Sequence, residues 1–483
     1  MTRRDTPTSL SAMYDRDDIA DRLRQIAGMD GVLDTADAMA RYLRDWRGLY
    51  HGKALAVARP ATVDAVAAAI RFCADRKIGI VPQGGNTGLV GGATPAGDGS
   101  EIVLSLERLN RIRAIDPLDF TLVAEAGCIL ADVQAAAAGA NRLFPLSLGA
   151  EGTCQIGGNI ATNAGGINVL RYGNARDLVL GLEVVLADGT VWNDLRRVRK
   201  DNTGYALRQL LIGSEGTLGI ITAAALKLFP LPRQRVAALA AMQAVRQASE
   251  LFGHCMEHAG EFVTSFEYMS SAAVELAVET VPGTKRPFEQ AHGAYVLIEL
   301  AGSLDEPPLG TVLERFLGDA LERGTIIDAI LPEMESRRLA LWRLREAVVE
   351  AQRVGGASVK HDVSVPVSDV PAFIAAADVA VEAALPGTRI LPFGHLGDGN
   401  IHYNLMRPLA LDDETFRRHG PTLTKAVHDV VDAFSGSFSA EHGLGQMRRG
   451  EAIHRKSNTE RELMAEIKSL FDPGAILNRG KVL

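Results

Sequence analysis

Apolar residues in the first half of the chain recur with two spacings, which predict both helices and strands. After Thr62, apolar positions follow the i, i+3, i+4, i+7 spacing of a helix up to Cys73, and threonine is a favoured helix N-cap. A second amphipathic helix is expected at residues 18–26. Short apolar runs predict strands at residues 78–81, 102–106 and 121–125.

The pattern changes after residue 231, where Pro230 and Pro232 follow an apolar strand. Predicted strands at residues 295–300 and 363–365 then alternate with predicted helices at residues 312–322, 370–384 and 413–434. This alternation is typical of a second, smaller α+β unit. The predicted organisation is a lead-in at residues 1–49, a first domain at 50–231, a second domain at 232–445 and a C-terminal segment at 446–483 that packs back on the first domain.

Three glycine-rich stretches lie beside predicted strands at residues 82–92, 148–166 and 212–220. Each combines many backbone N–H groups with little side-chain bulk, so the main chain can approach a polyphosphate closely. One such loop is weak evidence because turns are rich in glycine, but three within about 140 residues favour a phosphate-bearing cofactor. No GxGxxG motif follows a strand into a helix, and GxxxxGK[ST], HExxH and GxSxG are absent.

The stretch GHLGDGNIHYN at residues 394–404 predicts a β-hairpin whose turn is Asp398-Gly399. In that register His395 faces His402, and Leu396 faces Ile401 on the opposite side of the ribbon. Asn404 then lies on the histidine face. Two imidazoles side by side can chelate a metal ion, and the alternative is a pair of solvated strand histidines.

Composition and charge narrow the functional classes. The chain has 483 residues, 47% of them hydrophobic, with a net charge of −8 that gives no reason to expect nucleic-acid binding. The four scattered cysteines suit a reducing compartment. The N-terminus has no apolar core of a secretory signal, and no window has the roughly 18 apolar residues of a transmembrane helix. The expected location is the cytoplasm, with peripheral contact at the inner membrane left open.

Several motifs together resemble a known family. PQGGNTGLVGG, LGAEGTCQIGGNIATNAGG and DNTGYALRQLLIGSEGTLGI resemble the FAD-binding half of the vanillyl-alcohol-oxidase-type (PCMH) flavoproteins. GHLGDGNIHYN and SAEHG resemble the D-2-hydroxy-acid dehydrogenase branch, and LWRLREAVVEA and VKHDVSVPV are closest to the D-2-hydroxyglutarate dehydrogenases. The resemblance implies a two-domain α+β flavoprotein with an FAD-binding PCMH-type domain, a substrate-binding cap and a C-terminal tail returning to the FAD domain.

The resemblance also implies a set of FAD-binding residues. The first loop would hold the pyrophosphate, the second would run toward the isoalloxazine, the third would lie near the adenine, and the tail would add one asparagine. The residues are Pro82, Gly84, Gly85, Asn86, Thr87, Gly88, Leu148, Gly149, Gly157, Gly158, Ala161, Thr162, Asn163, Gly165, Gly219, Ile220 and Asn478. Members with covalent FAD often use a histidine beside the first loop, where this chain has GGNTG, so the expected flavin is non-covalent.

For the metal, the resemblance implies binding by His395, His402 and Glu441, with zinc in well-understood members. Two nitrogens, one carboxylate and an open position also suit catalytic zinc chemically. His442 would be the catalytic base and would bind substrate with Asn404. Arg345 and Lys360 would grip a distal carboxylate.

The predicted function is flavin-dependent oxidation of a D-2-hydroxy acid, with D-2-hydroxyglutarate as the preferred substrate. Val349 stands where the family usually has a hydroxyl residue, which leaves D-lactate or glycolate dehydrogenase as an alternative. A metallohydrolase and a non-catalytic flavin-binding subunit are rivals from other classes. The expected electron acceptor is electron-transferring flavoprotein or a quinone, and a homodimer is one assembly state left open.

Overall fold

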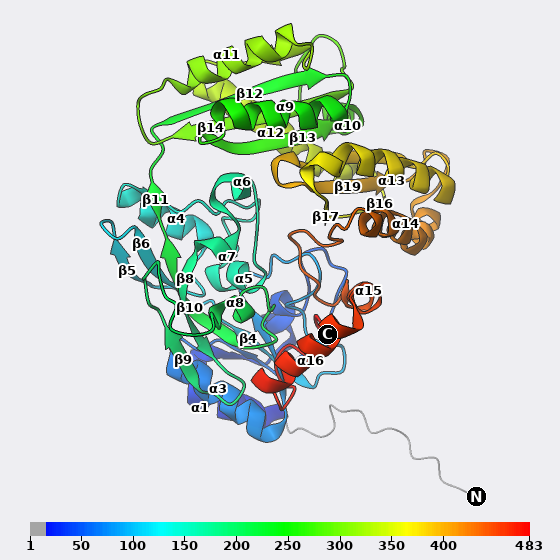
Figure 1. Ribbon diagram of the computed structural model, residues 1–483. Coiled ribbons are helices and arrows are strands. Elements are labelled where there is room, and N and C mark those ends of the chain that lie inside the picture. Colours follow the sequence, from blue (N-terminus) through cyan, green and yellow to red (C-terminus); the bar gives the residue numbers. More distant parts are fainter. Residues whose placement is uncertain (1–15) are drawn as a thin grey trace, which may run out of the picture. The chain divides into compact units, whose positions relative to one another are not determined.

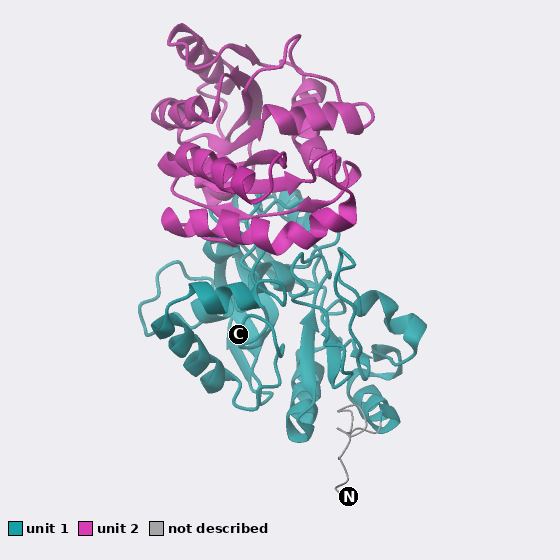
Figure 2. Ribbon diagram, turned by 90° about the vertical axis from the view of Figure 1, so that its right-hand side faces the viewer, with its two compact units in different colours: residues 1–166, 173–230, 441–483 teal, residues 167–172, 231–440 magenta. Residues whose placement is uncertain are grey.

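A computed structural model describes residues 16–483, so most of the N-terminal stretch considered for a secretory signal lies outside the described residues. The chain forms two compact units, coloured separately in Figure 2. The first contains the residues up to Gly166, Gly173–Pro230 and Glu441–Leu483, and the second contains Ile167–Tyr172 and Leu231–Ala440. The divisions after Pro230 and Ala440 lie close to the predicted positions 231 and 445, but the inclusion of Ile167–Tyr172 in the second unit was not foreseen.

The first unit contains two larger sheets and one short strand pair among its described residues (Figure 1). The four-stranded sheet has the order β1 (Val32–Leu33), β2 (Val57–Ala58), β4 (Glu101–Ser105) and β3 (Gly79–Gln83). The antiparallel five-stranded sheet has the order β5 (Ile112–Asp116), β6 (Thr121–Glu125), β10 (Ile220–Lys227), β8 (Val179–Val185) and β9 (Val191–Asp194). The short pair is β7 (Arg142–Leu143) with β11 (Phe229–Pro230).

Helices of the first unit begin and end where the local sequence favours it. Helix α3 (Val63–Arg76) starts after Thr62, whose hydroxyl accepts a hydrogen bond from the N–H of Ala65, and ends at Lys77 in the left-handed conformation. The other helical segments are α1 (Arg16–Ala27), η2 (Met29–Gly31), α2 (Ala36–Met39), η3 (Ala40–Tyr42), α4 (Leu130–Gly139), α5 (Ile156–Ala161), α7 (Ala175–Leu178), α8 (Arg208–Leu211), α15 (Arg449–Arg455) and α16 (Asn458–Phe471).

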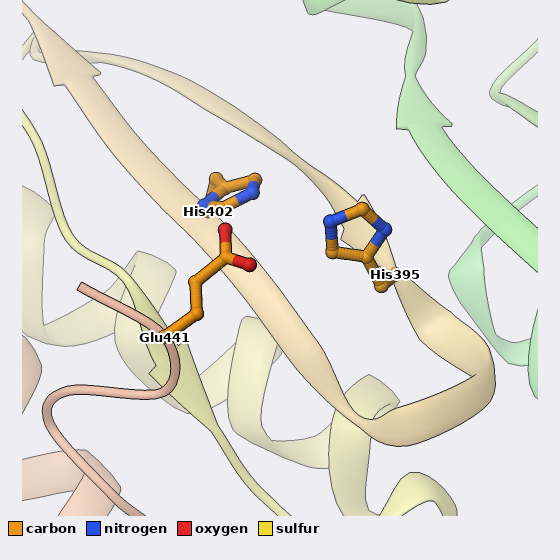
Figure 3. Close-up of side chains that lie close together, drawn as sticks. All are labelled: His395, His402 and Glu441. Atoms are coloured by element: carbon orange, nitrogen blue, oxygen red, sulfur yellow. The ribbon is translucent and has the colours of Figure 1, made fainter. Parts of the chain in front are cut away.

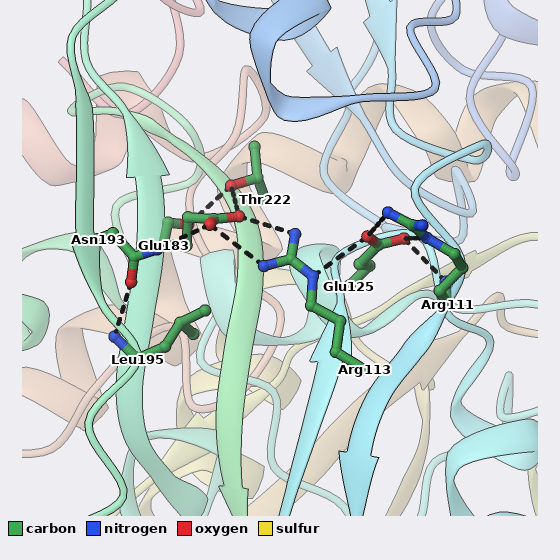
Figure 4. A network of polar contacts seen from close by, with 7 residues as sticks. All are labelled: Arg111, Arg113, Glu125, Glu183, Asn193, Leu195 and Thr222. Atoms are coloured by element: carbon green, nitrogen blue, oxygen red, sulfur yellow. Dashed lines mark hydrogen bonds and ion pairs between the residues drawn. The ribbon is translucent and has the colours of Figure 1, made fainter.

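A buried ion-pair network lies on one face of the five-stranded sheet (Figure 4). Ala223 of β10 is paired with Glu125 on one side and with Glu183 on the other, so both carboxylates point to the same face. Arg113 bridges them, with Nε 3.1 Å from Glu125 and Nη2 2.9 Å from Glu183. Burial raises the pKa of Glu125, but hydrogen bonds and charge from Arg111 and Arg113 outweigh that effect and lower it.

The second unit is built on one antiparallel sheet with the strand order β15-β12-β14-β13-β18-β19-β16, to which β17 adds beside β19. In sequence order the strands are β12 (Gln234–Met242), β13 (Val263–Ser270), β14 (Ala294–Gly302), β15 (Asp328–Ile330), β16 (Ser358–Val359), β17 (Val363–Ser364), β18 (Arg389–His395) and β19 (Asn400–Met406). The helical segments are α6 (Val169–Tyr172), α9 (Val245–Ala259), α10 (Ser271–Thr280), α11 (Leu309–Glu322), α12 (Glu335–Val354), η4 (Val367–Asp369), α13 (Val370–Ala384), η5 (Leu396–Asp398) and α14 (Asp413–Ala433).

Both faces of this sheet are covered by helices, because its central strands are apolar on both sides. On one face, Ala238 and Ala240 of β12 belong to a core with α9, α11, α13 and α14. On the other, Ala237 and Leu239 belong to a core with α10 and α12. The predicted helix at residues 370–384 coincides with α13, and the α+β class of the unit is confirmed. No helix within residues 16–483 combines the length and apolar character that a membrane crossing needs.

We expect Arg113→Met to destabilise the first unit, because two buried carboxylates lose their shared counter-charge. The expected loss is about 2–3 kcal/mol at pH 7, below that of fully enclosed pairs because the arginine side chain is 25% exposed. Arg111→Met is the matched control: it also removes a partner of Glu125, but its side chain is 73% exposed, so less than about 1 kcal/mol is expected.

The effect of Arg113→Met should depend on pH. The native pKa of Glu125 is lowered, so the pair stabilises the protein above the unfolded glutamate value of about 4.3 and less as pH falls below it. The difference in urea midpoint between wild type and variant should therefore be largest at pH 7, persist down to about pH 4.3 and shrink as the pH falls further toward about pH 3. A difference that grows on acidification would contradict this account.

Candidate active site

A glycine-rich pocket lies in the first unit, between the loop after β3 and the start of α5. Twelve of the predicted FAD-binding residues line it: Pro82, Gly84, Gly85, Asn86, Thr87, Gly88, Gly157, Gly158, Ala161, Thr162, Gly219 and Ile220. Leu148, Gly149, Asn163, Gly165 and Asn478 are not among its lining residues. Stretches from three separate parts of the sequence thus form one pocket.

The backbone of this pocket requires glycine at specific points. A Cβ on Gly85 would lie 2.1 Å from the carbonyl oxygen of Thr153, and one on Gly157 would lie 2.6 Å from the Cβ of Ala126. By contrast, a Cβ on Gly88 or Gly158 would meet open space. The missing side chains therefore let two loops approach each other and leave main chain accessible from the pocket, as a bound phosphate-bearing cofactor requires.

Gln155, which the sequence analysis missed, also fits an absent ligand. It lines the pocket, and its buried side-chain oxygen has no hydrogen-bond partner among the described residues. Buried acceptors are rarely left unsatisfied, so a hydroxyl or N–H group of a bound molecule would complete this one. The residues present therefore fit an FAD-type cofactor.

Glu215 was also missed, although it lies in the motif GSEGTLGI. Its backbone has φ of 51°, and its carboxylate accepts the N–H groups of Leu444 at 2.7 Å and Gly445 at 2.8 Å. Burial raises the pKa of Glu215, and these two N–H groups oppose the rise. Glu215 thereby anchors the loop that follows Glu441 and His442.

Asn478 anchors the C-terminal tail to the same unit. Its backbone N–H donates to the carbonyl of Ile80 in β3, and its side-chain amide donates to the carbonyls of Gly92 and Glu215. Gly92 and Glu215 both line the pocket. Asn478 thus fixes the main chain at two residues that line the pocket.

The histidine hairpin of the second unit differs from its predicted register. The turn is η5 followed by Gly399, and His395 pairs with Asn400 while Phe393 pairs with His402. The prediction that His395 directly faces His402 is therefore wrong, because the loop has four residues instead of two. The two histidines are diagonal neighbours on one face, with ring centroids 5.7 Å apart.

His395, His402 and Glu441 form a candidate metal group, with one ligand atom from each lying within 4.8 Å of the others (Figure 3). Glu441 directly follows the last residue of the second unit. The preceding segment is tied to that unit because Ser437 pairs with Ser364, and the N–H of Ala440 donates to the carbonyl of Asp362. Two imidazoles and one carboxylate suit a catalytic divalent ion with an open position.

His395 is oriented by Glu267, a β13 residue that the sequence analysis missed. The Nδ1 of His395 lies 2.6 Å from Oε1 of Glu267, and Glu267 is 1% exposed. Burial raises the pKa of Glu267, but its interactions with His395 and Arg345 outweigh that effect and lower the pKa. A carboxylate behind a ligating imidazole is a common support of metal sites.

The proposed substrate residues occupy different environments in the second unit. Arg345 is buried, with Nε 2.9 Å from Glu267 and Cζ 4.8 Å from the ring centroid of Phe393. Lys360 is exposed. Asn404 is buried, with its amide bonded to Gln352 and to the N–H of His361.

His442, the predicted base, belongs to the first unit and lines its glycine-rich pocket. Its Nε2 lies 3.8 Å from Oε1 of Glu441, its neighbour in sequence. The roles of His442, Lys360, Arg345 and Asn404 stay predictions.

Two family models match the chain in sequence. The FAD binding domain matches residues 54–194, and the C-terminal domain of FAD linked oxidases matches residues 231–482. This chain belongs to the FAD-linked oxidases. The family resemblance inferred from the motifs is thus confirmed, together with the two-domain fold.

Relatives of this FAD-linked oxidase extend over nearly its whole length. The mitochondrial D-2-hydroxyglutarate dehydrogenase of Bos taurus is 38% identical over 479 residues, covering 98% of this chain and 84% of that protein. The D-2-hydroxyglutarate dehydrogenase of Xanthomonas citri pv. viticola is 37% identical over 444 residues, covering 92% of each. The structure of p-cresol methylhydroxylase with substrate bound is similar in fold, with a TM-score of 0.75, 16% identity and 96% coverage of each chain.

We expect Gly158→Leu to prevent flavin binding without unfolding the protein, because the new side chain enters open space in the pocket. The flavin content should fall about tenfold or more, which corresponds to a clash of at least 1.4 kcal/mol. Gly97→Leu is the control, since a Cβ there also meets open space but Gly97 does not line the pocket. Acid-released flavin per chain measures the result, and unchanged flavin in Gly158→Leu would contradict the assignment.

Proposed function

We propose that this FAD-linked oxidase oxidises a D-2-hydroxy acid to the 2-oxo acid, with D-2-hydroxyglutarate and 2-oxoglutarate as the preferred pair. The observation that carries the proposal is the group of His395, His402 and Glu441 in a chain that also has an FAD-binding domain. The nearly full-length relatives named D-2-hydroxyglutarate dehydrogenase support the choice of substrate.

When bound, a divalent ion on this group, with zinc as the favoured ion, would lower the pKa of the substrate hydroxyl, and non-covalent FAD would accept the hydride. His442 takes the hydroxyl proton at Nε2 and returns it to solvent, so that one proton and one hydride leave the hydroxy acid. Arg345 offers its two terminal nitrogens to a carboxylate, and Lys360 adds a point charge. Asn404 orients the substrate from β19.

The buried Arg345 favours a five-carbon diacid over a shorter acid, because it can bind the carboxylate farthest from the hydroxyl group. Arg345 is a buried cation on the same sheet face as the two histidines, which suits a second carboxylate. Val349, one turn after Arg345 on α12, is 47% exposed and offers no hydrogen bond. D-lactate and glycolate therefore stay as the alternative substrates, whereas a metallohydrolase leaves the FAD-binding domain without a role.

The physiological electron acceptor is proposed as electron-transferring flavoprotein or a quinone. A homodimer and a cytoplasmic location, with peripheral contact at the inner membrane, stay predictions from the sequence.

Anaerobic reduction of the bound flavin should identify the substrate. We expect D-2-hydroxyglutarate to bleach the flavin absorbance fastest, D-lactate and glycolate more slowly, and L-isomers about 100-fold more slowly than their D-isomers, because the site binds specific polar groups. Stopped-flow absorbance measures the rates. Equal rates with D- and L-isomers would contradict the proposal, and faster bleaching by D-lactate would select the alternative substrate.

Removal of the metal should distinguish the role of the metal ion from that of the flavin. Chelator treatment is expected to slow flavin bleaching by about 100-fold or more, because the hydroxyl loses its acidifying ion. The flavin spectrum should stay unchanged, because the glycine-rich pocket does not include His395 or His402. Re-addition of Zn²⁺ should restore the rate, and bleaching that survives complete metal removal would refute the metal role.

A further inference from the structure

Glu267 lies at the centre of the sheet in the second unit, where a charge is costly. It belongs to β13, which is hydrogen-bonded to β14 on one side and β18 on the other. Its direct cross-strand partners are Leu297 of β14 and His395 of β18. A carboxylate buried among apolar neighbours persists only where donors satisfy both of its oxygens.

Each oxygen of Glu267 has a different donor. Oε1 is 2.6 Å from Nδ1 of His395, and Oε2 is 2.9 Å from Nε of Arg345. The carboxylate therefore connects a strand residue of the candidate metal group with a residue of α12 that is proposed to bind substrate. One buried charge holds two side chains from different elements.

The contact with His395 determines which ring nitrogen can coordinate a metal ion. A carboxylate accepts hydrogen bonds, so Nδ1 of His395 carries the proton and the lone pair lies on Nε2. The ring orientation is fixed as well, because strand register places His395 directly opposite Glu267. Such support of a ligating histidine is worth about 10- to 100-fold in metal affinity.

The contact with Arg345 determines which part of the guanidinium faces a ligand. Only Nε has a hydrogen-bond partner among residues 16–483, and the group stacks on Phe393. Phe393 is the direct cross-strand partner of His402, with ring centroids 5.0 Å apart. The two terminal nitrogens therefore stay available as a planar fork for a carboxylate.

We propose that Glu267 is a positioning residue that acts on both sides of the site. It sets the metal-binding nitrogen of His395 and orients the terminal fork of Arg345, so metal affinity and carboxylate affinity depend on the same buried carboxylate. The effect on carboxylate binding rests on the proposed function, whereas the effect on metal binding rests on the contact between Glu267 and His395 and on the candidate metal group.

The test uses the full-length, flavin-loaded protein stripped of metal. Co²⁺ affinity is measured by competition with a coloured chelator, and 2-oxoglutarate affinity by the change in flavin absorbance. Glu267→Gln should lower Co²⁺ affinity about 10- to 100-fold, because a neutral amide accepts the hydrogen bond from the imidazole N–H more weakly than a carboxylate does. It should also weaken 2-oxoglutarate binding. Arg345→Met should weaken only 2-oxoglutarate, because the bond between Glu267 and His395 remains.

Glu299 provides a matched control in the same sheet. It is a buried carboxylate of β14 that accepts hydrogen bonds from Arg338 and Trp342 of α12, seven and three residues before Arg345. Glu299→Gln thus breaks an equivalent buried ion pair without touching a histidine. It should leave the Co²⁺ affinity within about threefold of wild type, a change of less than 1 kcal/mol.

The outcomes are separable. Wild-type Co²⁺ affinity retained in Glu267→Gln overturns the inference, and so does an equal loss in Glu299→Gln or Arg345→Met. If Glu267→Gln does not fold, the double variant Glu267→Gln with Arg345→Met removes both buried charges and is expected to fold and to show the same loss of Co²⁺ affinity. If wild type binds Co²⁺ but oxidises no D-2-hydroxy acid, the proposed function fails while the Co²⁺ comparison still decides the effect on metal binding.

Discussion

The pairing of β18 with strands on both of its edges is the constraint on which the candidate site depends. On one edge its register places His395 opposite Glu267, and on the other it places Phe393 opposite His402. A slip by one residue would turn both imidazoles toward the opposite face, where Leu396, Ile401 and Tyr403 belong to the apolar core. The burial of those apolar residues therefore fixes the position of the polar ones.

Helix α12 adds a second constraint through arginines that are buried against the sheet. Arg338 and Arg345 are seven residues apart, which places them two turns apart on one face of the helix. Arg338 forms an ion pair with Glu299 of β14, and Arg345 forms one with Glu267 of the neighbouring strand β13. Buried ion pairs seldom add net stability, but each is costly to break, so together they specify how the helix packs on the sheet. That packing buries Arg345 and holds its guanidinium group in one orientation.

The glycine-rich pocket of the first unit depends on segments that are remote in sequence. Its walls come from the loop after β3, from α5 and from the start of β10, and the side chains of Glu215 and Asn478 hold them together. Glu215 fastens the loop at Leu444 and Gly445, and Asn478 fastens Gly92. A long, charged cofactor needs such long-range support. If the loops were flexible, ordering them on binding would cost conformational entropy and weaken the affinity for the cofactor.

Sequence patterns alone predicted the family, the α+β class, the glycine-rich pocket and the two neighbouring histidines. These features reside in local patterns: glycine where a side chain would clash, turn residues beside alternating strands, and capping residues at helix ends. The hairpin register became clear only from the folded protein, because a four-residue loop and a two-residue turn are both compatible with the sequence around Asp398-Gly399. Likewise, Glu267 and Gln155 look like ordinary residues in sequence. The importance of Glu267 comes from burial and from partners that lie 78 and 128 residues away in the sequence. That of Gln155 comes from a buried oxygen that has no hydrogen-bond partner within residues 16–483, and neither feature follows from spacing along the chain.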